Sequence, residues 1–251
     1  METQLILSLL IAVALGCYIQ AVTGFAMGLI VMGIVATLQL APIVLLAALI
    51  SLIGLVNVSM SLHNNHHHIH WHTFKIVILG MIPAMIAGVL LLDYLSENFV
   101  EILQLILGIS IIISGILLIL KPHPHERLLS TFSTWLTGLA SGILAGMFST
   151  GAPPLIFTLY KQPLSIDTIR STILAIFLIA SSISRIAFIS TQGHIGLEVM
   201  TLFLYSLPIV FIFTWLGKKY PPALSDIAMR RFAFGLLVLL GISTTSSYFI
   251  K

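Results

Sequence analysis

The stretch FSTGAPP, residues Phe148–Pro154, interrupts one of many long apolar segments in this chain. Proline lacks the N–H that a helix interior needs but suits a first helical turn, and Ser and Thr commonly precede one. We therefore expect one helix to end in this stretch and another, 152–162, to begin at once, with Ser149 and Thr150 in capping positions.

A similar interruption, QAVTG at Gln20–Gly24, precedes the segment 25–39. At 1.5 Å per residue, the segments 25–39 and 152–162 extend only about 16–23 Å, whereas the hydrocarbon core of a bilayer is ~30 Å thick. Neither segment can therefore cross a membrane as a single helix. The sequence predicts two half-helices, each beginning directly after a break.

The residues around both breaks are apolar enough to lie in a membrane. Hydrophobic residues make up 59% of the 251 residues and charged residues 8%, whereas about a quarter of a soluble domain is charged. No Asp, Glu, Lys or Arg occurs from Thr3 to Phe74, and apolar runs of membrane-spanning length follow. We expect an all-α polytopic membrane protein that is multi-pass in the cell (plasma or inner) membrane.

The apolar segments fall into two sets of five, and the second member of each set is the short one. They are 5–22, 25–39, 41–62, 74–92 and 98–120, then 132–148, 152–162, 165–190, 196–216 and 228–250. Sliding the chain along itself by 126 residues places Gly16 on Gly142 and Thr23 on Ser149. The pattern predicts two membrane repeats, 1–124 and 125–251.

The basic residues indicate how the broken segments cross the membrane, since Lys and Arg in short loops mark the cytoplasmic side. If each broken pair were one straight crossing, these cations would divide four against six. If each pair is a hairpin, only Lys251 lies on one side and nine share the other: Lys75, Lys121, Arg127, Lys161, Arg170, Lys218, Lys219, Arg230 and Arg231. The hairpin arrangement puts both termini outside the cytoplasm.

The same arrangement inverts one half relative to the other, which is typical of secondary transporters. Each repeat would be a broken or re-entrant helix hairpin plus three transmembrane helices, giving eight to ten membrane segments in all. Two hairpins that enter from opposite faces would bring their breaks together near the middle of the bilayer. Backbone that leaves the helix at this depth needs protein or a watery cavity around it.

The N-terminus of each half-helix offers N–H groups and the positive end of its dipole, which suits a small anion. A packing role for the glycine and proline kinks is the alternative, but the recurrence of the break in both halves favours a site. The candidate binding residues are Gln20, Thr23, Gly24, Asn57, Ser149, Thr150, Gly151, Ala152, Ser182 and Arg185.

Arg185 is the only charged residue well inside a predicted span. It either faces a cavity or a partner inside the bundle or, lying about one turn from the end of its segment, snorkels to the membrane interface. Arg170, at the cytoplasmic start of the same segment, is interpreted as a positive-inside anchor.

The stretch HNNHHHIHWH at His63–His72 could bind a transition metal. It is expected in a cytoplasmic loop with no acidic residue nearby, and a solvated loop is the preferred interpretation. No carboxylate lies in the interior of a predicted span, because Asp93 and Asp226 are expected in loops and the others near helix ends: Glu101, Asp167 and Glu198. The sequence shows no catalytic triad and no metal-ligand helix, so we expect no enzymatic activity, no metal site and no cofactor.

The stretch GLASGILAGMFSTGAPP at Gly138–Pro154, together with RST at Arg170–Thr172, resembles the sulfite exporter TauE/SafE family. Its members are duplicated membrane proteins of about this length with a glycine-rich break in the first helix of each half. The first half departs from that pattern, because Thr23–Gly28 is poorer in glycine. The resemblance implies export or uptake of sulfite, sulfonates or related small organic anions.

The leading hypothesis is a secondary transporter (exporter or permease) for small anions such as sulfite, sulfonates or other organic acids. It would work by alternating access, with the anion held at the facing half-helix N-termini. The alternative is a transition-metal permease that uses the loop 63–72, and a membrane-embedded enzyme or assembly factor is a third class. The expected partners are a small anion and the lipid bilayer, with no nucleic acid, and the chain could form a homodimer.

Overall fold

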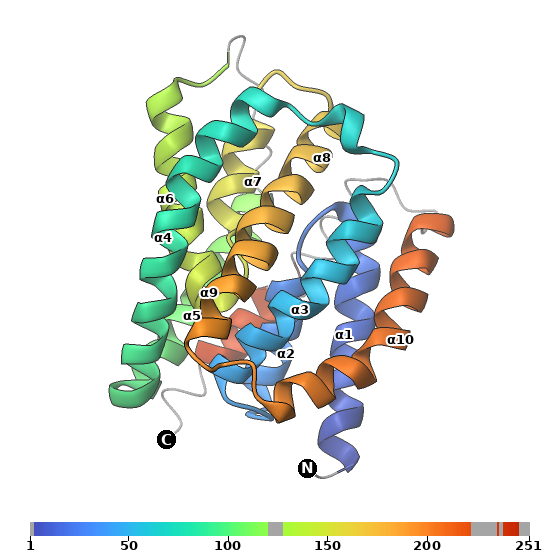
Figure 1. The fold of residues 1–251 in the computed structure, drawn as a ribbon, viewed down its shortest axis with the longest axis vertical. Coiled ribbons are helices and arrows are strands. Elements are labelled where there is room, and N and C mark those ends of the chain that lie inside the picture. The colour runs from blue at the N-terminus through green and yellow to red at the C-terminus, as the bar shows by residue number, and fades with distance from the viewer. Residues whose placement is uncertain (1–2, 120–127, 222–234, 236–237, 246–251) are drawn as a thin grey trace.

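The protein is a bundle of helices in the computed structural model, which describes residues 3–119, 128–221, 235 and 238–245 (Figure 1). The helices are α1 (Thr3–Thr23), α2 (Met27–Thr37), α3 (Ile43–Leu62), η1 (His66–His68), α4 (Trp71–Asn98), α5 (Val100–Ile119), α6 (Thr131–Phe148), α7 (Ala152–Tyr160), α8 (Ile166–Ile176), η2 (Phe177–Ser184), α9 (Arg185–Thr191) and α10 (Leu197–Lys219). Helices α8, η2 and α9 form one continuous run whose middle part, η2, is π-helical.

Within the described residues, five helices are long and apolar enough to cross a bilayer. They span Ile6–Thr23, Ile43–Leu62, Trp71–Asn98, Ile166–Thr191 and Leu197–Lys219. Helices α2 and α7 are too short to do so, with 11 and 9 residues. The chain is an all-helical polytopic membrane protein, as the sequence predicts, and its two short half-helices begin directly after the predicted breaks.

Both breaks turn the chain back on itself. Gly16 of α1 lies against Met27 and Val31 of α2, and Thr137 of α6 lies beside Thr158 of α7, with 3.0 Å between their hydroxyl oxygens. A continuous helix would carry such residues apart by about 1.5 Å for each residue between them. The broken segments are therefore hairpins, which is the arrangement that the basic residues favoured.

Helices α4 and α6 pack backbone to backbone. Gly138, Gly142 and Gly146 of α6 form a stripe of small residues at four-residue spacing, and a Cβ on any of them would meet backbone atoms of α4. Gly80 and Gly88 of α4 face the α6 backbone in the same way. Such stripes let helices approach closely in a membrane, where the hydrophobic effect gives no driving force between them.

Helices α1 and α10 form a second close pair. Gly217 of α10 lies against Tyr18 and Ala21 of α1, and the Tyr18 hydroxyl donates a hydrogen bond to the Tyr220 carbonyl at 3.0 Å. In each case, the first helix of one sequence half packs against the fourth predicted segment of the other half. The two halves thus interlock reciprocally.

The described helix ends that carry basic residues lie toward one end of the bundle, called the basic end below. These are the starts of α4 and α8 and the ends of α7 and α10, at the upper end of Figure 1. Their cations are Lys75, Lys161, Arg170, Lys218 and Lys219. The other five residues in the comparison of loop charges lie outside the described residues: Lys121, Arg127, Arg230, Arg231 and Lys251.

The expectation that Asp93 lies in a loop is wrong. Helix α4 extends from Trp71 to Asn98 rather than over 74–92, so Asp93 lies inside it. The His194 side chain lies beside this carboxylate, with 3.4 Å between its Nε2 and an Asp93 oxygen. Asp226 lies outside the described residues, and of the predicted segment 228–250 only residues 235 and 238–245 are described, all of them helical.

Candidate functional site

The two helix breaks meet inside the bundle. Gly28, in the first turn of α2, lies so close to the second break that a Cβ on it would stand 3.0 Å from the Thr150 Cβ. Helix α3 touches the same break through Ser51, whose hydroxyl oxygen is 2.8 Å from that of Ser149. The structure therefore brings together the two regions that the sequence comparison aligned.

A small cavity of about 20 Å³ lies between the breaks. Both breaks line it together with α3 and the π-helix η2, and its polar lining consists of Gln20, Ser149, Thr150, Ser181 and Ser182. This volume holds about one water molecule. The two breaks are thus closed upon each other, and a polyatomic anion would need them to separate.

The first break is held by unusual backbone and by its own threonine. Gly24 and Ala26 have φ angles of 86° and 87°, and a non-glycine residue in this left-handed region is strained. The Thr23 hydroxyl oxygen lies 2.8 Å from the carbonyl oxygens of both Ile19 and Phe25. Thr23 and Gly24, two predicted binding residues, therefore shape the break.

Gln20 caps the first half-helix. Its Oε1 accepts a hydrogen bond of 3.0 Å from the N–H of Met27, the first residue of α2. One of the N–H groups that would otherwise face a ligand is thereby satisfied within the protein. Gln20 also lines the cavity, so it combines the predicted binding position with a structural role.

The second break ends α6 with Ser149 in the left-handed conformation at φ 57°. The prediction that Ser149 and Thr150 cap the next helix is wrong, because Gly151 occupies the N-cap position and has no side chain to accept a hydrogen bond from the first turn. Ala152 begins α7, followed by two prolines in its first turn as expected. Because prolines carry no N–H, α7 offers the positive end of its dipole but fewer donors than an ordinary helix start.

Gly151 has no room for a side chain. A Cβ at this position would meet the backbone carbonyl of Ser141 in α6 and the end of the Met81 side chain. This is where α7 turns back against α6, so the glycine is required by close approach. Neither Gly151 nor Ala152 lines the cavity.

Arg185 holds the second break in place. Its side chain is 1% exposed, and Nε donates to the Gly146 carbonyl at 3.0 Å. Nη1 donates to the Ala47 carbonyl at 2.8 Å and to the Ser51 hydroxyl at 2.7 Å. Since Ser51 also contacts Ser149, hydrogen bonds connect the guanidinium to the break.

Among the sequence-based alternatives for Arg185, this arrangement corresponds to a side chain that faces partners inside the bundle. The side chain does not snorkel to the interface, because it is buried among helices, and it does not line the cavity. An arginine inside a membrane is stabilised when its donors find carbonyl partners. Arg185 is therefore a positioning residue for the second break.

The π-helix η2 contributes two serines to the cavity. π-helical turns are rare and are frequent at functional sites. The Ser182 hydroxyl lies 3.2 Å from where a Cβ on Gly54 would stand, so the glycine leaves it space. Ser181 is 4% exposed, and its hydroxyl has no hydrogen-bond partner among the described residues. Such an unsatisfied buried group is rare in proteins and is available to a ligand.

Asn57 lies apart from the other candidates. Its Nδ2 donates to the Thr214 hydroxyl at 2.7 Å and to the Cys17 carbonyl at 3.4 Å. It thereby joins α3 to α10 and α1, and it does not line the cavity. The repeat offset could not show this, because it compares positions along the chain and carries no information on which helices are neighbours.

The candidate binding residues predicted from the sequence do not include Ser51, Ser181 or Gly28. A signal for the two serines was available, because polar residues within a membrane helix usually face the interior or a partner. Gly28 gave no such signal, since its role depends on how closely the other half approaches.

The histidine-rich loop forms no metal site. His66–His68 form the short helix η1 and are exposed. No group of three or more His, Cys, Asp or Glu side chains that could hold a metal ion occurs within the part of the chain that the structure describes. The geometry thus gives the metal-permease alternative no support.

Comparison with known proteins agrees with the membrane architecture. A family model described as sulfite exporter TauE/SafE matches residues 8–244. A Cupriavidus necator protein described as the probable sulfite/organosulfonate exporter TauE is 38% identical over 246 residues, covering 97% of this chain and 96% of that protein.

A second relative comes from Comamonas testosteroni and is described as the probable inner membrane transporter protein TsaS. It is 27% identical over 182 residues, which cover 72% of this chain and 74% of that protein. No solved structure matches the chain. The family match includes both hairpins and the cavity between them, and the chain belongs to the sulfite exporter TauE/SafE family.

Proposed function

We propose that this protein is a secondary transporter that carries small anions such as sulfite, sulfonates or other organic acids across the cell membrane. The observation that carries the proposal is the meeting of two helix breaks around a buried polar cavity, with Gly28 against Thr150. Relatives named as a sulfite/organosulfonate exporter and an inner membrane transporter support it. The protein moves its substrate and has no enzymatic activity of its own.

The cavity suits an anion by its donors. The hydroxyls of Ser149, Thr150, Ser181 and Ser182 can each donate a hydrogen bond, and the N-terminus of α2 directs the positive end of its dipole toward the same space. None of the described residues that line the cavity is charged. Recognition by neutral donors makes binding moderate in strength, which favours release on the far side.

Transport requires the cavity to enlarge, because about 20 Å³ holds only a water-sized guest. The two hairpins would separate and approach again as access alternates between the two faces of the membrane. Gly24, Ala26 and Ser149, the left-handed residues at the breaks, are the natural hinges.

The two halves, 1–124 and 125–251, would be inverted repeats. The reciprocal packing of α1 on α10 and of α6 on α4 supports this. The gathering of described basic residues at one end supports a cytoplasmic basic end and termini on the outer side of the cell (plasma or inner) membrane. A small anion and lipid are the partners of this mechanism, which involves no nucleic acid; a homodimer stays a prediction.

Flux of sulfite and of methanesulfonate into proteoliposomes tests the proposal. Ser149→Ala removes a hydroxyl from the cavity and is expected to lower flux at least about fivefold, as the loss of one hydrogen bond at a site predicts. Ser165→Ala is the matched control. The Ser165 hydroxyl forms hydrogen bonds with Thr168 at the start of α8, and Ser165 does not line the cavity. Unchanged flux in Ser149→Ala would show that the breaks do not form the site.

The metal-permease alternative is tested in the same vesicles. Replacing His66–His68 with alanine leaves anion flux intact if the breaks hold the substrate, because these exposed side chains line neither pocket. Zn²⁺ flux in the wild type that these changes abolish would favour the alternative.

A further inference from the structure

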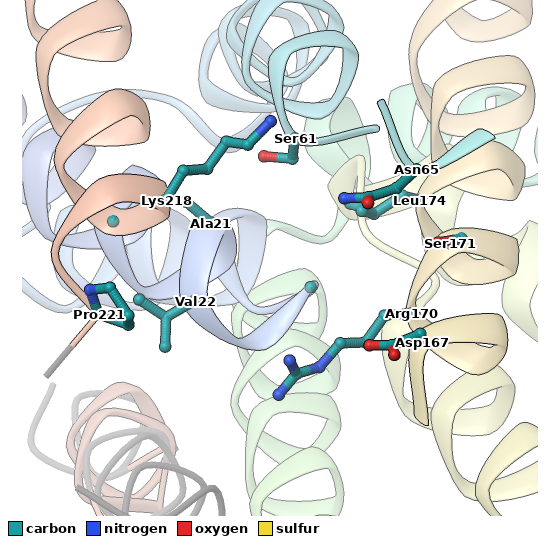
Figure 2. A pocket seen from close by; sticks show the side chains of 12 residues that line it. Ala21, Val22, Ser61, Asn65, Asp167, Arg170, Ser171, Leu174, Lys218 and Pro221 are labelled. Carbon is teal, nitrogen blue, oxygen red and sulfur yellow. The ribbon is translucent and has the colours of Figure 1, made fainter. Parts of the chain in front are cut away.

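A second, larger pocket opens at the basic end beside the first break (Figure 2). Its volume is about 270 Å³, enough for several water molecules or a small organic anion. In Figure 2, Lys218 reaches in from one side and Arg170 and Asp167 line the opposite side. Ser61 comes from the last turn of α3, and Asn65 comes from the loop that follows this helix. We call this pocket the vestibule.

Helix α3 lines both the vestibule and the cavity with one face. Gly54 and Val58 line the cavity, and Ser61 lines the vestibule. Successive positions are three or four residues apart, which is the spacing of one helix face. The α3 face therefore leads continuously from one space to the other.

The run α8–η2 does the same on the other side. Arg170 and Leu174 line the vestibule, whereas Phe177 and Ser181 line the cavity one and two turns further on. Two helix faces from different parts of the chain thus border the same route. A single pocket at a helix end would not require such a continuation into the bundle.

The first break stands between the two spaces. Val22 and Gly24 line the vestibule, and Ala26 and Gly28 line the cavity. The stem of Arg170 packs on the break, since a Cβ on Gly24 would stand 3.3 Å from the Arg170 Cγ. Moving this short segment of left-handed backbone would connect the vestibule with the cavity.

The vestibule has the chemistry of an anion site. Two cationic side chains and one carboxylate line it, which leaves a positive balance. Lys218 is anchored by hydrogen bonds from Nζ to the carbonyls of Met60 at 2.7 Å and His63 at 3.3 Å. Ser61 is 5% exposed and its hydroxyl has no hydrogen-bond partner among the described residues, so it can donate a hydrogen bond to an anionic group.

We propose that the vestibule is a second anion-binding site, through which a small sulfonate or sulfite gains access to the cavity from the basic end. Arg170 and Lys218 concentrate the anion, Ser61 donates to it, and the first break is the gate beneath it. This inference rests on the proposed transport function, and it assigns Arg170 a binding role in place of simple membrane anchoring.

Opposite charge changes in the vestibule test the electrostatic part. Arg170→Gln should raise the half-saturating methanesulfonate concentration on the basic-end side on the order of tenfold, the scale of one unit charge several ångströms away. Asp167→Asn should lower that concentration by a similar factor. Lys161→Gln and Lys219→Gln are matched controls at the same end that do not line the vestibule, and they should leave it unchanged.

Cysteine labelling tests the site without requiring transport. Cys17 is the only cysteine and is replaced with alanine, and Ser171→Cys then places a thiol in the vestibule with Arg170 and Asp167 intact. An anionic methanethiosulfonate reagent should react several-fold faster than a cationic one, and methanesulfonate should slow the reaction. Adding Arg170→Gln should abolish the preference for the anionic reagent.

The two experiments separate the failure of this inference from failure of the transport function. Three results would each contradict an anion site in the vestibule. They are equal labelling rates with both reagents, no protection by methanesulfonate, and identical half-saturating concentrations in Arg170→Gln and Asp167→Asn. An anion preference with protection would support it, even in a protein that shows no flux, in which case the transport function alone would fail.

Discussion

At the scale of single residues, the second break depends on one buried cation. Arg185 is 1% exposed, yet its guanidinium donates to two carbonyl oxygens and one hydroxyl on α3 and α6. Its planar fork serves partners in different directions, which a lysine ammonium at the end of a flexible stem cannot do in the same way. The identity of this residue, and not only its charge, therefore fixes the position of the break.

Arg185→Lys is expected to destabilise the protein by about 2 kcal/mol or more, because hydrogen bonds to a charged group contribute about 1.5–3 kcal/mol each. Thermal unfolding in detergent measures this as a lower Tm. Ser190→Ala in the same helix is the control, since the Ser190 hydroxyl is exposed and bonds only to the Ile186 carbonyl. An unchanged Tm in Arg185→Lys would mean that the guanidinium does not hold the break.

Ser181→Ala should separate stability from transport. Its hydroxyl has no partner among the described residues, so removing it should leave the Tm unchanged or raise it, because an unsatisfied buried group is costly. Sulfite flux should nevertheless fall several-fold, since the hydroxyl lines the cavity. A lower Tm with normal flux would reverse the assignment and make Ser181 structural.

The positions of the two breaks can be predicted from the sequence. The roles of the individual residues at the breaks are harder to predict. Pro153 and Pro154 mark the start of a helix by their chemistry alone, and that helix begins at Ala152. Ser149 looks like a cap but instead contacts Ser51 on α3, a partner nearly a hundred positions away. A residue type constrains local backbone, whereas its tertiary partner depends on the packing of other helices.

At the scale of helices, the glycine stripe of α6 determines how closely α4 approaches. Glycine side chains are absent, so the two backbones come into direct contact over Gly138, Gly142 and Gly146. The same helix carries the second break at its end. Close packing thus gives the hairpin a rigid support.

Gly142→Leu should disrupt this pair. Even a Cβ at position 142 would meet the Met81 carbonyl and the Ala84 side chain, so we expect a loss of at least about 2 kcal/mol of stability from overpacking. Gly196→Ala is the control, because a Cβ at position 196 meets nothing within 4 Å. Equal Tm values for the two variants in detergent would contradict the packing.

Helix partners could not be predicted from the segments themselves. One apolar membrane segment matches another almost equally well, so the sequence predicts the helices without indicating that α4 pairs with α6 or α10 with α1. In the sequence, the glycine stripe of α6 belongs to the family pattern, and nothing in that pattern marks it as a contact surface. Its partner on α4, with Gly80 and Gly88, becomes evident only in three dimensions.

At the scale of the whole molecule, helices from the two halves of the sequence pack in pairs around the two breaks. Each half supplies a hairpin and packs its first helix on the fourth predicted segment of the other. This packing brings the two breaks into contact although they lie more than a hundred residues apart in the sequence. It also predicts that the α3–α4 loop and the α9–α10 loop lie on opposite sides of the membrane (Figure 1).

Labelling with an impermeant maleimide checks this orientation in the Cys17→Ala background. His67→Cys in the α3–α4 loop should react only in inverted membrane vesicles if the basic end faces the cytoplasm, as proposed above. Gln192→Cys in the α9–α10 loop should react only from the outer side of the cell membrane, which is tested in cells or spheroplasts whose cell membrane is intact. Labelling of both positions from the same side would refute the arrangement.

The central claim is that the two breaks form one site that must open for transport, and a reversible cross-link between them tests it most directly. Gly28→Cys with Thr150→Cys places two thiols where the Cβ positions nearly touch, within reach of a disulfide after a small adjustment. Thr137→Cys with Thr158→Cys, inside one hairpin, is the control. Oxidation should abolish methanesulfonate flux in the first pair and spare it in the second, and dithiothreitol should restore it. Full flux through protein cross-linked between Gly28 and Thr150 positions would contradict the account.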